Sequence, residues 1–176
     1  MKSGSTDVWV EYIYHSARSR RGAEAAAGGN LLKGLSLGRS GARGLMKLAE
    51  SHSDFPDALL GAGSYRFWKS VASGPARNLP ILGDERRRGI DEVKIAIERG
   101  RLSGPLANTV LMEMLISFDT DAAAELGSRL VRDYPGCRLF AWQYGEALKE
   151  LKRFDDAREV FERLAGMYGN DPADDG

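Results

Sequence analysis

Two histidines and one cysteine are the side chains best suited to metal binding or nucleophilic catalysis in this chain of 176 residues. His15 and His52 lie far apart in the sequence and belong to no recognisable metal-ligand motif. Cys137 stands alone, so it can form no internal disulfide and no thiolate metal site. A catalytic thiol also needs a histidine placed beside it, and the sequence near Cys137 supplies none. We therefore predict no metal site and no catalytic residue.

Sequence motifs for phosphate and cofactor binding are incomplete or missing. Residues 61–63, Gly-Ala-Gly, begin like a dinucleotide-binding loop but lack the third glycine and a preceding strand. Three arginines at 86–88 have the charge to bind phosphate, yet Asp84 and Glu85 beside them are typical of a solvated first helical turn. No phosphate-binding lysine loop and no Gly-x-Ser-x-Gly motif occurs. The sequence predicts no cofactor, and it predicts that the protein is not an enzyme.

The charge of the chain is balanced overall but unevenly distributed. Lys and Arg number 25, as do Asp and Glu, so no global field attracts nucleic acid, and no nucleic-acid partner is expected. Residues 1–53 carry eight basic and four acidic side chains, whereas residues 138–176 carry six basic and nine acidic ones. Scattered surface charge with an acidic tail explains this pattern. A basic first hairpin that faces a membrane or a polyanion is the alternative.

No segment of the sequence is predicted to cross a membrane. No run approaches the roughly 18 apolar residues that a transmembrane helix needs. The first residues also lack the apolar core of a signal peptide. A single cysteine fits a reducing or an oxidising compartment. The sequence therefore leaves the localisation open between cytoplasm and periplasm.

The elements that must position these side chains are predicted to be helices. The clearest periodicity lies near the C-terminus, where apolar residues recur at helical spacing in two consecutive segments: Phe140, Tyr144, Ala147, Leu148 and Leu151, then Phe154, Ala157, Val160, Phe161, Leu164 and Ala165. Lys152 and Arg153 interrupt the pattern between them. Because this connection is so short, the two helices must be antiparallel neighbours.

The same plan recurs upstream at a constant interval. Ala157, Ala123 and Gly89 are small residues that follow one another up the chain at equal separations. The interval is about 34 residues, which is the period of one helical hairpin in a stacked array. We predict an all-α fold, a right-handed stack of antiparallel helical hairpins that forms a single domain over residues 1–176. The predicted hairpins span about 5–54, 55–100, 104–135 and 138–169, followed by a frayed tail at 170–176.

Two segments depart from this regular plan. The predicted helix at 31–51 contains four glycines, Gly34, Gly38, Gly41 and Gly44, each of which costs a helix about 1 kcal/mol relative to alanine. Such a helix needs tertiary support, and its glycines permit close approach of a neighbour. The second hairpin contains a long loop at 73–83, where two prolines forbid a continuous helix. Leu79, Ile81 and Leu82 favour a packed loop.

The last two predicted hairpins resemble tetratricopeptide repeats of a divergent bacterial type. Tyr144-Gly145 followed by Leu148 stands where the family has Leu-Gly and then Tyr, and Ala157 followed by Phe161 matches its Ala-x-x-x-Phe pattern. Trp142 comes one place later than the family's tryptophan, and Pro172 comes late.

The preceding repeat matches the family less closely. In residues 104–137, Ala123 and Pro135 match, but Leu111-Met112 replaces Leu-Gly and Gly127 replaces the bulky aromatic residue. The resemblance covers roughly the second half of the chain, from the helix that carries Gly89 onward, and is weak before it.

This resemblance implies a binding groove. In the family, the inner helix of each hairpin lines a concave surface. Carried over by the constant repeat interval, the groove residues here are Tyr65, Lys69, Asn108, Met112, Trp142, Glu146 and Lys149. The first two belong to the groove only if residues 57–72 form an inner helix. Tryptophan is enriched in binding hot spots, although Trp142 also lies next to the family's core position.

The predicted function is a noncatalytic protein–protein interaction scaffold that binds a peptide or protein partner in this groove. A first alternative is a self-associating assembly or cell-envelope component, a homo-oligomer formed through the apolar N-terminal hairpin. A second alternative is a small-ligand binder or enzyme with a pocket under the 73–83 loop. The sequence identifies neither the partner nor the oligomeric state.

Overall fold

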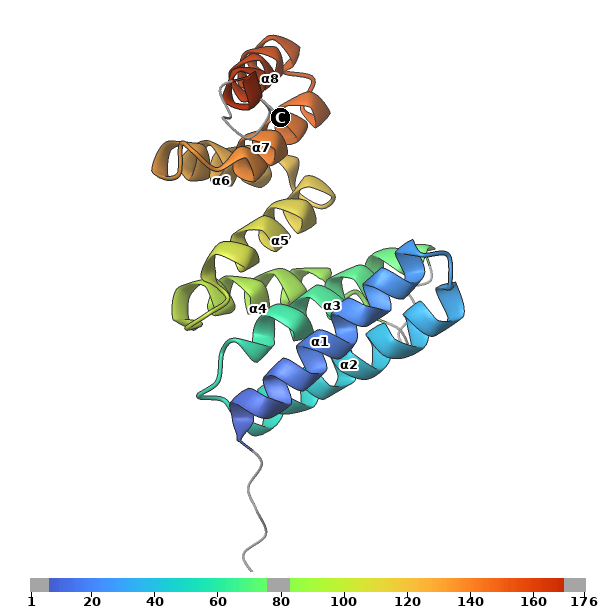
Figure 1. The fold of residues 1–176 in the computed structure, drawn as a ribbon. Coiled ribbons are helices and arrows are strands. Elements are labelled where there is room, and N and C mark those ends of the chain that lie inside the picture. The colour runs from blue at the N-terminus through green and yellow to red at the C-terminus, as the bar shows by residue number, and fades with distance from the viewer. Residues whose placement is uncertain (1–6, 76–82, 170–176) are drawn as a thin grey trace, which may run out of the picture. The chain divides into compact units, whose positions relative to one another are not determined.

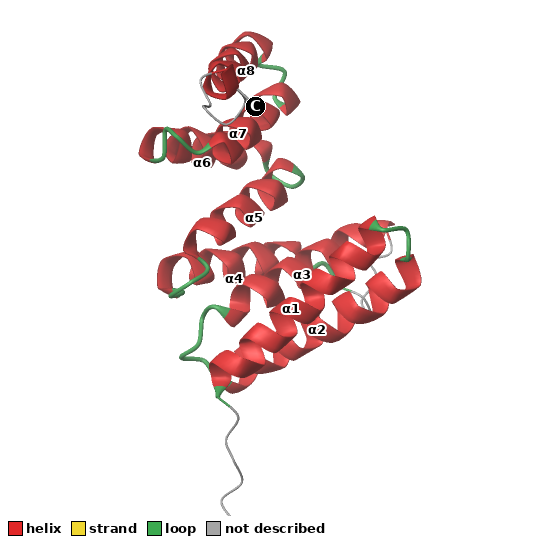
Figure 2. Ribbon diagram, viewed as in Figure 1, coloured by secondary structure: helices red, strands yellow, loops and turns green. Residues whose placement is uncertain are grey.

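The computed structural model describes residues 7–75 and 83–169, which form eight α-helices and no β-strand (Figures 1 and 2). In chain order the helices are α1 (Val8–Ala27), α2 (Leu31–Ser51), α3 (Ala58–Ala72), α4 (Arg86–Arg99), α5 (Gly104–Ile116), α6 (Thr120–Asp133), α7 (Arg138–Glu150) and α8 (Phe154–Gly169). The predicted all-α class is confirmed. Consecutive helices pack against each other, which is consistent with stacked hairpins. The right-handed superhelix stays a prediction.

The chain divides into two compact units, Met1–Ala107 and Asn108–Gly176. The first unit holds α1 to α4 and the first residues of α5. The second holds the rest of α5 with α6, α7 and α8. The single domain over residues 1–176 stays a prediction. The expected frayed tail at 170–176 lies outside the described residues, as do residues 76–82 of the long loop.

In the first unit, the turn between α1 and α2 follows from its sequence. Gly29 has a φ of 85°, a left-handed conformation that ends α1 and that glycine adopts without strain. Asn30 then caps α2, because its side-chain oxygen accepts a hydrogen bond from the Lys33 N–H at 3.1 Å. Residues 28–30 therefore separate α1 from α2.

The glycines of α2 allow α1 and α2 to pack with their backbones in near contact. A Cβ atom added to Gly22 of α1 would lie 2.5 Å from the Gly38 nitrogen, and one added to Gly41 would lie 2.6 Å from the Ser19 nitrogen. Gly44 lies against the ring of His15. Residue numbers rise along α1 as they fall along α2, so the two helices are antiparallel. The expected close helix approach is confirmed.

Aromatic side chains close the other end of this helix pair. Trp9 of α1 meets Phe55, just after α2, edge to face with ring centroids 4.6 Å apart. Tyr12 packs on the same Phe55 ring at 5.5 Å. Leu48 and Ala58 complete the buried cluster. These contacts fix the start of α1 against the connection from α2 to α3.

The α3–α4 pair in the first unit also depends on two glycines. A Cβ atom added to Gly63 would lie 2.6 Å from the Gly89 carbonyl oxygen, and the reverse distance is the same. Phe67, fully buried on α3, packs beside Gly89. Gly89 is one of the small residues that recur at the repeat interval. It must be small because the backbone of α3 packs directly on it.

Two alanine substitutions test the glycine contact between α1 and α2. Gly22→Ala should lower the free energy of unfolding by about 1–3 kcal/mol, because its methyl group would collide with the α2 backbone. Gly38→Ala should raise it by up to about 1 kcal/mol, because its Cβ meets nothing within 4 Å and alanine favours the helix. Urea denaturation followed by circular dichroism measures both. Equal effects of the two substitutions would contradict the close approach.

Candidate functional site

In the second unit, α7 presents an exposed apolar pair and an ion pair along one helical face. Leu139, Trp142, Glu146 and Lys149 follow each other at intervals of three and four residues, which places them on the same side of the helix. Leu139 is 48% exposed and Trp142 is 49% exposed. We call these four residues the α7 face.

The charged end of the α7 face is ordered by its own contact. The Lys149 Nζ atom donates to a Glu146 carboxylate oxygen. This hydrogen bond raises the pKa of Lys149. Both side chains keep contact with solvent, so the pair adds little to stability. The pair does place two opposite charges one and two helical turns after Trp142, where they can orient a bound chain.

Met112, which the sequence analysis placed in the groove, is instead a core residue. It is fully buried and packs in a cluster with Leu130 and Phe140. A Cβ atom added to Gly127 of α6 would lie 2.8 Å from the Tyr144 ring and 3.1 Å from the Met112 Cε atom, so both side chains pack into the space that Gly127 leaves. Met112 is not available to a partner at the surface.

The reason for this difference is a register shift of one residue between α5 and α7. Burial pairs Met112 with Gly145, Met114 with Ala147, and Leu115 with Leu148, all 33 positions apart. A shift of 34 would pair exposed Glu113 with buried Ala147. The structural counterparts of Trp142 and Glu146 on α5 are therefore Thr109 and Glu113. Asn108, the predicted counterpart, is half-buried.

A side-chain hydrogen bond ties α5 to α7 in this register. Gln143 is fully buried, and its Nε2 atom donates to the Thr109 carbonyl oxygen at 2.9 Å. Glu113, one turn along α5 from Thr109, is exposed, but neighbouring protein atoms partly desolvate its carboxylate and so raise its pKa. The sequence analysis missed both Gln143 and Glu113. A polar residue among buried apolar neighbours was the available signal for Gln143.

Tyr65 and Lys69, the other predicted groove residues, lie on α3 in the first unit. Tyr65 is half-buried. The Lys69 Nζ atom lies 3.5 Å from a Glu85 carboxylate oxygen, so its charge is paired within that unit. The α7 face consists of second-unit residues only.

The second unit also has two hollows beside α6 that the sequence did not predict, and they share Ser128 and Tyr144. The hollow of ≈ 690 Å³ lies between α6, α7 and the turn after α7, and the hollow of ≈ 510 Å³ lies between α6, α7 and α8. Ala141 of α7 lines one hollow. Ala141 itself is buried, whereas the adjacent Trp142 is half-exposed.

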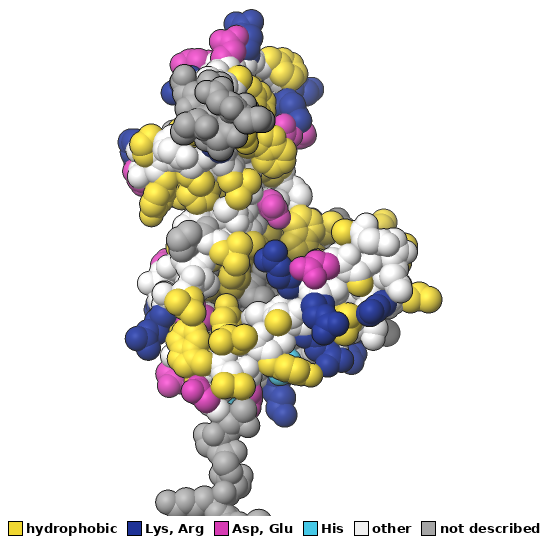
Figure 3. Space-filling model, viewed as in Figure 1, with side chains coloured by type: hydrophobic (Ala, Val, Ile, Leu, Met, Phe, Trp, Pro, Cys, Tyr) yellow, Lys and Arg dark blue, Asp and Glu magenta, His cyan; other side chains and the backbone are white. Residues whose placement is uncertain are grey.

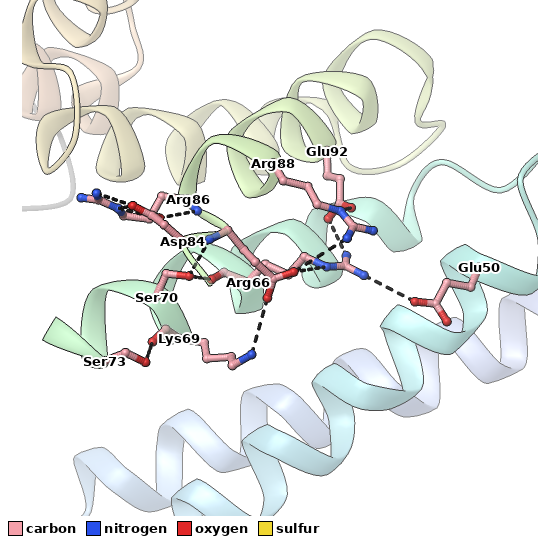
Figure 4. Close-up of polar contacts among 10 residues, drawn as sticks. Glu50, Arg66, Lys69, Ser70, Ser73, Asp84, Arg86, Arg88 and Glu92 are labelled. Atoms are coloured by element: carbon pink, nitrogen blue, oxygen red, sulfur yellow. Dashed lines mark hydrogen bonds and ion pairs between the residues drawn. The ribbon is translucent and has the colours of Figure 1, made fainter. Parts of the chain in front are cut away.

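A buried arginine organises the polar contacts of the first unit (Figure 4). The side chain of Arg66 on α3 is only 4% exposed. Its Nη1 atom donates to Glu92 of α4 at 2.6 Å, and its guanidinium lies 3.5 Å from Glu50 and 3.6 Å from Glu85. Arg88 also pairs with Glu92, at 3.1 Å. The charges neutralise one another, which favours a structural role over a catalytic one.

The carboxylates around Arg66 differ in burial, which gives a test of this cluster. Glu92→Gln should lower the free energy of unfolding by roughly 3 kcal/mol, because it removes the shortest ionic contact of a buried cation. Glu50→Gln should cost under about 1 kcal/mol, because the Glu50 side chain is 66% exposed. Urea denaturation of the two variants measures the difference. A larger loss for Glu50→Gln would refute this ranking.

Asp57 is a second buried charge in the first unit. It is 1% exposed, and its two carboxylate oxygens accept hydrogen bonds from the backbone N–H groups of Arg101, Leu102 and Ser103 and from the Ser103 hydroxyl, at 2.9–3.0 Å. Burial alone would raise the pKa of Asp57, but these hydrogen bonds together hold it below its ordinary value of 3.8. The carboxylate thus anchors the loop before α5 to the start of α3.

The lowered pKa makes the stability of the first unit depend on pH. Because the folded pKa lies below the unfolded one, ionised Asp57 contributes stability above about pH 3.8, and this contribution is lost as the pH falls through the folded pKa. Asp57→Asn should destabilise the protein at neutral pH and should remove this part of the acid dependence. Urea midpoints across an acid pH series measure it.

The control for this pH dependence is Asp54→Asn. Asp54 is an exposed carboxylate shortly before Asp57, and its substitution should leave the acid dependence unchanged. An acid dependence that is the same in Asp57→Asn and in the wild-type protein would disprove the anchoring role.

The described part of the chain contains no group of three or more His, Cys, Asp or Glu side chains that could hold a metal ion. Within residues 7–75 and 83–169, no helix has the length and apolar character to span a membrane. Cys137 is half-buried.

Comparison of the chain with protein-family models, with curated proteins and with solved structures found no match in any of the three. The resemblance to tetratricopeptide repeats therefore stays a prediction. What stands is an all-α protein whose helices pack as sequential pairs.

Proposed function

We propose that this protein is a noncatalytic interaction module of tetratricopeptide-like helical hairpins that binds a peptide or protein partner. The observation that carries the proposal is the half-exposed Trp142 beside half-exposed Leu139 on α7. The other large apolar residues of that helix, Phe140 and Leu148, are buried. A solvent-facing tryptophan on a helix with an otherwise buried apolar side is typical of a binding hot spot.

The α7 face supports a specific mode of binding. An apolar side chain of the partner packs on the indole of Trp142 and on Leu139, which removes apolar area from water. The Glu146–Lys149 pair then sets the direction of the bound segment through its two opposite charges. Thr109 and Glu113 of α5 lie 33 positions before Trp142 and Glu146, and in this proposal they extend the α7 face onto α5.

A pair of substitutions on α7 tests this function. Trp142→Ala combined with Lys149→Glu should reduce recovery of the partner at least tenfold in affinity capture from the native cell, because it removes the apolar anchor and an orienting charge. The fold should be preserved, since both side chains are exposed. Quantitative mass spectrometry of the captured proteins measures the effect.

The matched control is Phe154→Ala, which removes an aromatic ring that is 63% exposed on α8 of the same unit. This control should leave recovery unchanged. Unaltered recovery of every partner by the α7 double variant would end the proposal. So would an equal loss with Phe154→Ala, because the effect would then not be specific to the α7 face.

The two alternatives from the sequence stay predictions. The proposed pocket under the 73–83 loop includes residues 76–82, which lie outside the described part of the chain. Self-association through the N-terminal hairpin is compatible with the exposed apolar residues there, Val10, Ile13, Tyr14, Leu31, Leu32 and Leu35.

A further inference from the structure

We propose that the α1–α2 hairpin docks on the surface of an anionic phospholipid membrane. The docking surface, which we call the basic face, consists of Tyr14, Arg18 and Arg21 of α1 with Arg43 and Lys47 of α2. This inference is independent of the α7 face and of the partner proposed to bind there.

The residues of the basic face come together across the two helices. Tyr14 and Lys47 line the same shallow groove of ≈ 430 Å³ between α1 and α2. The Arg18 Nη1 atom donates to the Tyr14 hydroxyl at 2.9 Å, and Arg21 follows one turn later. Arg43 precedes Lys47 by one turn and is exposed. Figure 3 shows Lys and Arg side chains gathered over α1 and α2.

The positive charge of this hairpin is only partly compensated within it. Helices α1 and α2 carry seven Arg and Lys residues against three acidic ones. Glu24 pairs with Arg20 at 3.3 Å, Glu50 is directed to Arg66 of α3, and Glu11 lines the same groove as Lys47. Among the described residues, Arg21, Arg43 and Lys47 have no ion-pair partner. Their charge is therefore available to an external anion.

The arginines of α8 and of the turn before it show the opposite arrangement. Arg153 pairs with Asp156 at 2.8 Å, and Arg158 pairs with Asp155 at 3.0 Å. Exposed arginines elsewhere in the described chain therefore do form ion pairs. The excess on α1 and α2 is a local property of that hairpin.

Exposed apolar residues border the basic face and favour a lipid surface over a nucleic acid. Val10, which lines the same groove as Tyr14, is 56% exposed, as is Tyr14. Leu32 is 83% exposed and shares the solvent side of α2 with Arg43 and Lys47, which follow it after about three and about four helical turns. Basic residues attract anionic headgroups, and neighbouring apolar residues enter the boundary with the acyl chains. A phosphate backbone offers no equivalent site for Leu32 or Val10.

The glycine contacts make the hairpin suitable for such docking. Because Gly22 and Gly41 allow the two backbones to come into near contact, the basic residues of α1 and α2 lie on adjacent helices. A helix of about 20 residues is about 30 Å long. Two such helices side by side can lie along the membrane plane and engage several headgroups together.

The experiment is sedimentation of the full chain with phospholipid vesicles. The protein should bind vesicles of equal parts phosphatidylcholine and phosphatidylglycerol but not pure phosphatidylcholine, and high salt should release most of it. Arg43→Glu with Lys47→Glu should weaken binding at least about tenfold, since each basic residue near an anionic membrane adds to the affinity. Leu32→Ser should weaken it by a smaller factor.

The matched control is Lys94→Glu with Arg99→Glu on α4, which makes the same change in net charge at two exposed residues. It should leave vesicle binding unchanged. Circular dichroism verifies the fold of each variant. If the reversal on α2 unfolds the protein, Arg43→Gln with Lys47→Gln and the salt dependence of the wild-type protein decide the question.

Three outcomes would overturn the proposal. The first is equal binding to both kinds of vesicle or no binding to either. The second is an equal loss with the α4 control. The third is preferential binding of duplex DNA that Leu32→Ser leaves unchanged, which would assign the basic face to a nucleic acid. Light scattering that shows dimers lost with Leu32→Ser, without vesicle binding, would assign it to a second copy of the chain.

Discussion

The packing of α3 against α4 depends on a buried charge, the guanidinium of Arg66. A cation with almost no contact with solvent is tolerated only when carboxylates surround it. Those carboxylates come from three places, the end of α2, the residue just before α4 and the first turns of α4. The short contact to Glu92 makes the packing of α3 depend on α4, whereas the exposed Glu50 adds a weaker link to α2.

The glycine contacts supply a second constraint, since they bring helix backbones into near contact. The α3–α4 pair approaches through Gly63 and Gly89, and the α1–α2 pair approaches through Gly22 and Gly38. The glycines that destabilise an isolated α2 thus include positions where α1 packs directly on its backbone, while Leu32 and Arg43 of α2 stay exposed.

In the second unit, the sizes of facing residues alternate between the two hairpins. In one, Gly127 of α6 faces Met112 of α5 and, at a shorter distance, Tyr144 of α7; in the next, Gly145 of α7 faces Phe161 of α8. This alternation accompanies the register of 33 between α5 and α7, whereas Gly127 and Phe161 of α6 and α8 keep 34. Equivalent surface residues of α5 and α7 must therefore be identified from their burial and packing, not from a fixed interval of 34 residues.

Periodicity alone was enough to predict the helical class and the helix at 31–51, because both follow from the local spacing of apolar residues. The sequence also singled out Trp142, Glu146 and Lys149, which do share one face of α7. It placed Met112 at the surface, and it did not identify Arg66 or Asp57 as buried charges. Those assignments needed tertiary structure, because helical spacing shows which residues share a face but not what lies opposite. Only the packed helices decide whether a methionine fills a space left by glycine, or whether a buried arginine meets carboxylates 16 and 26 residues away.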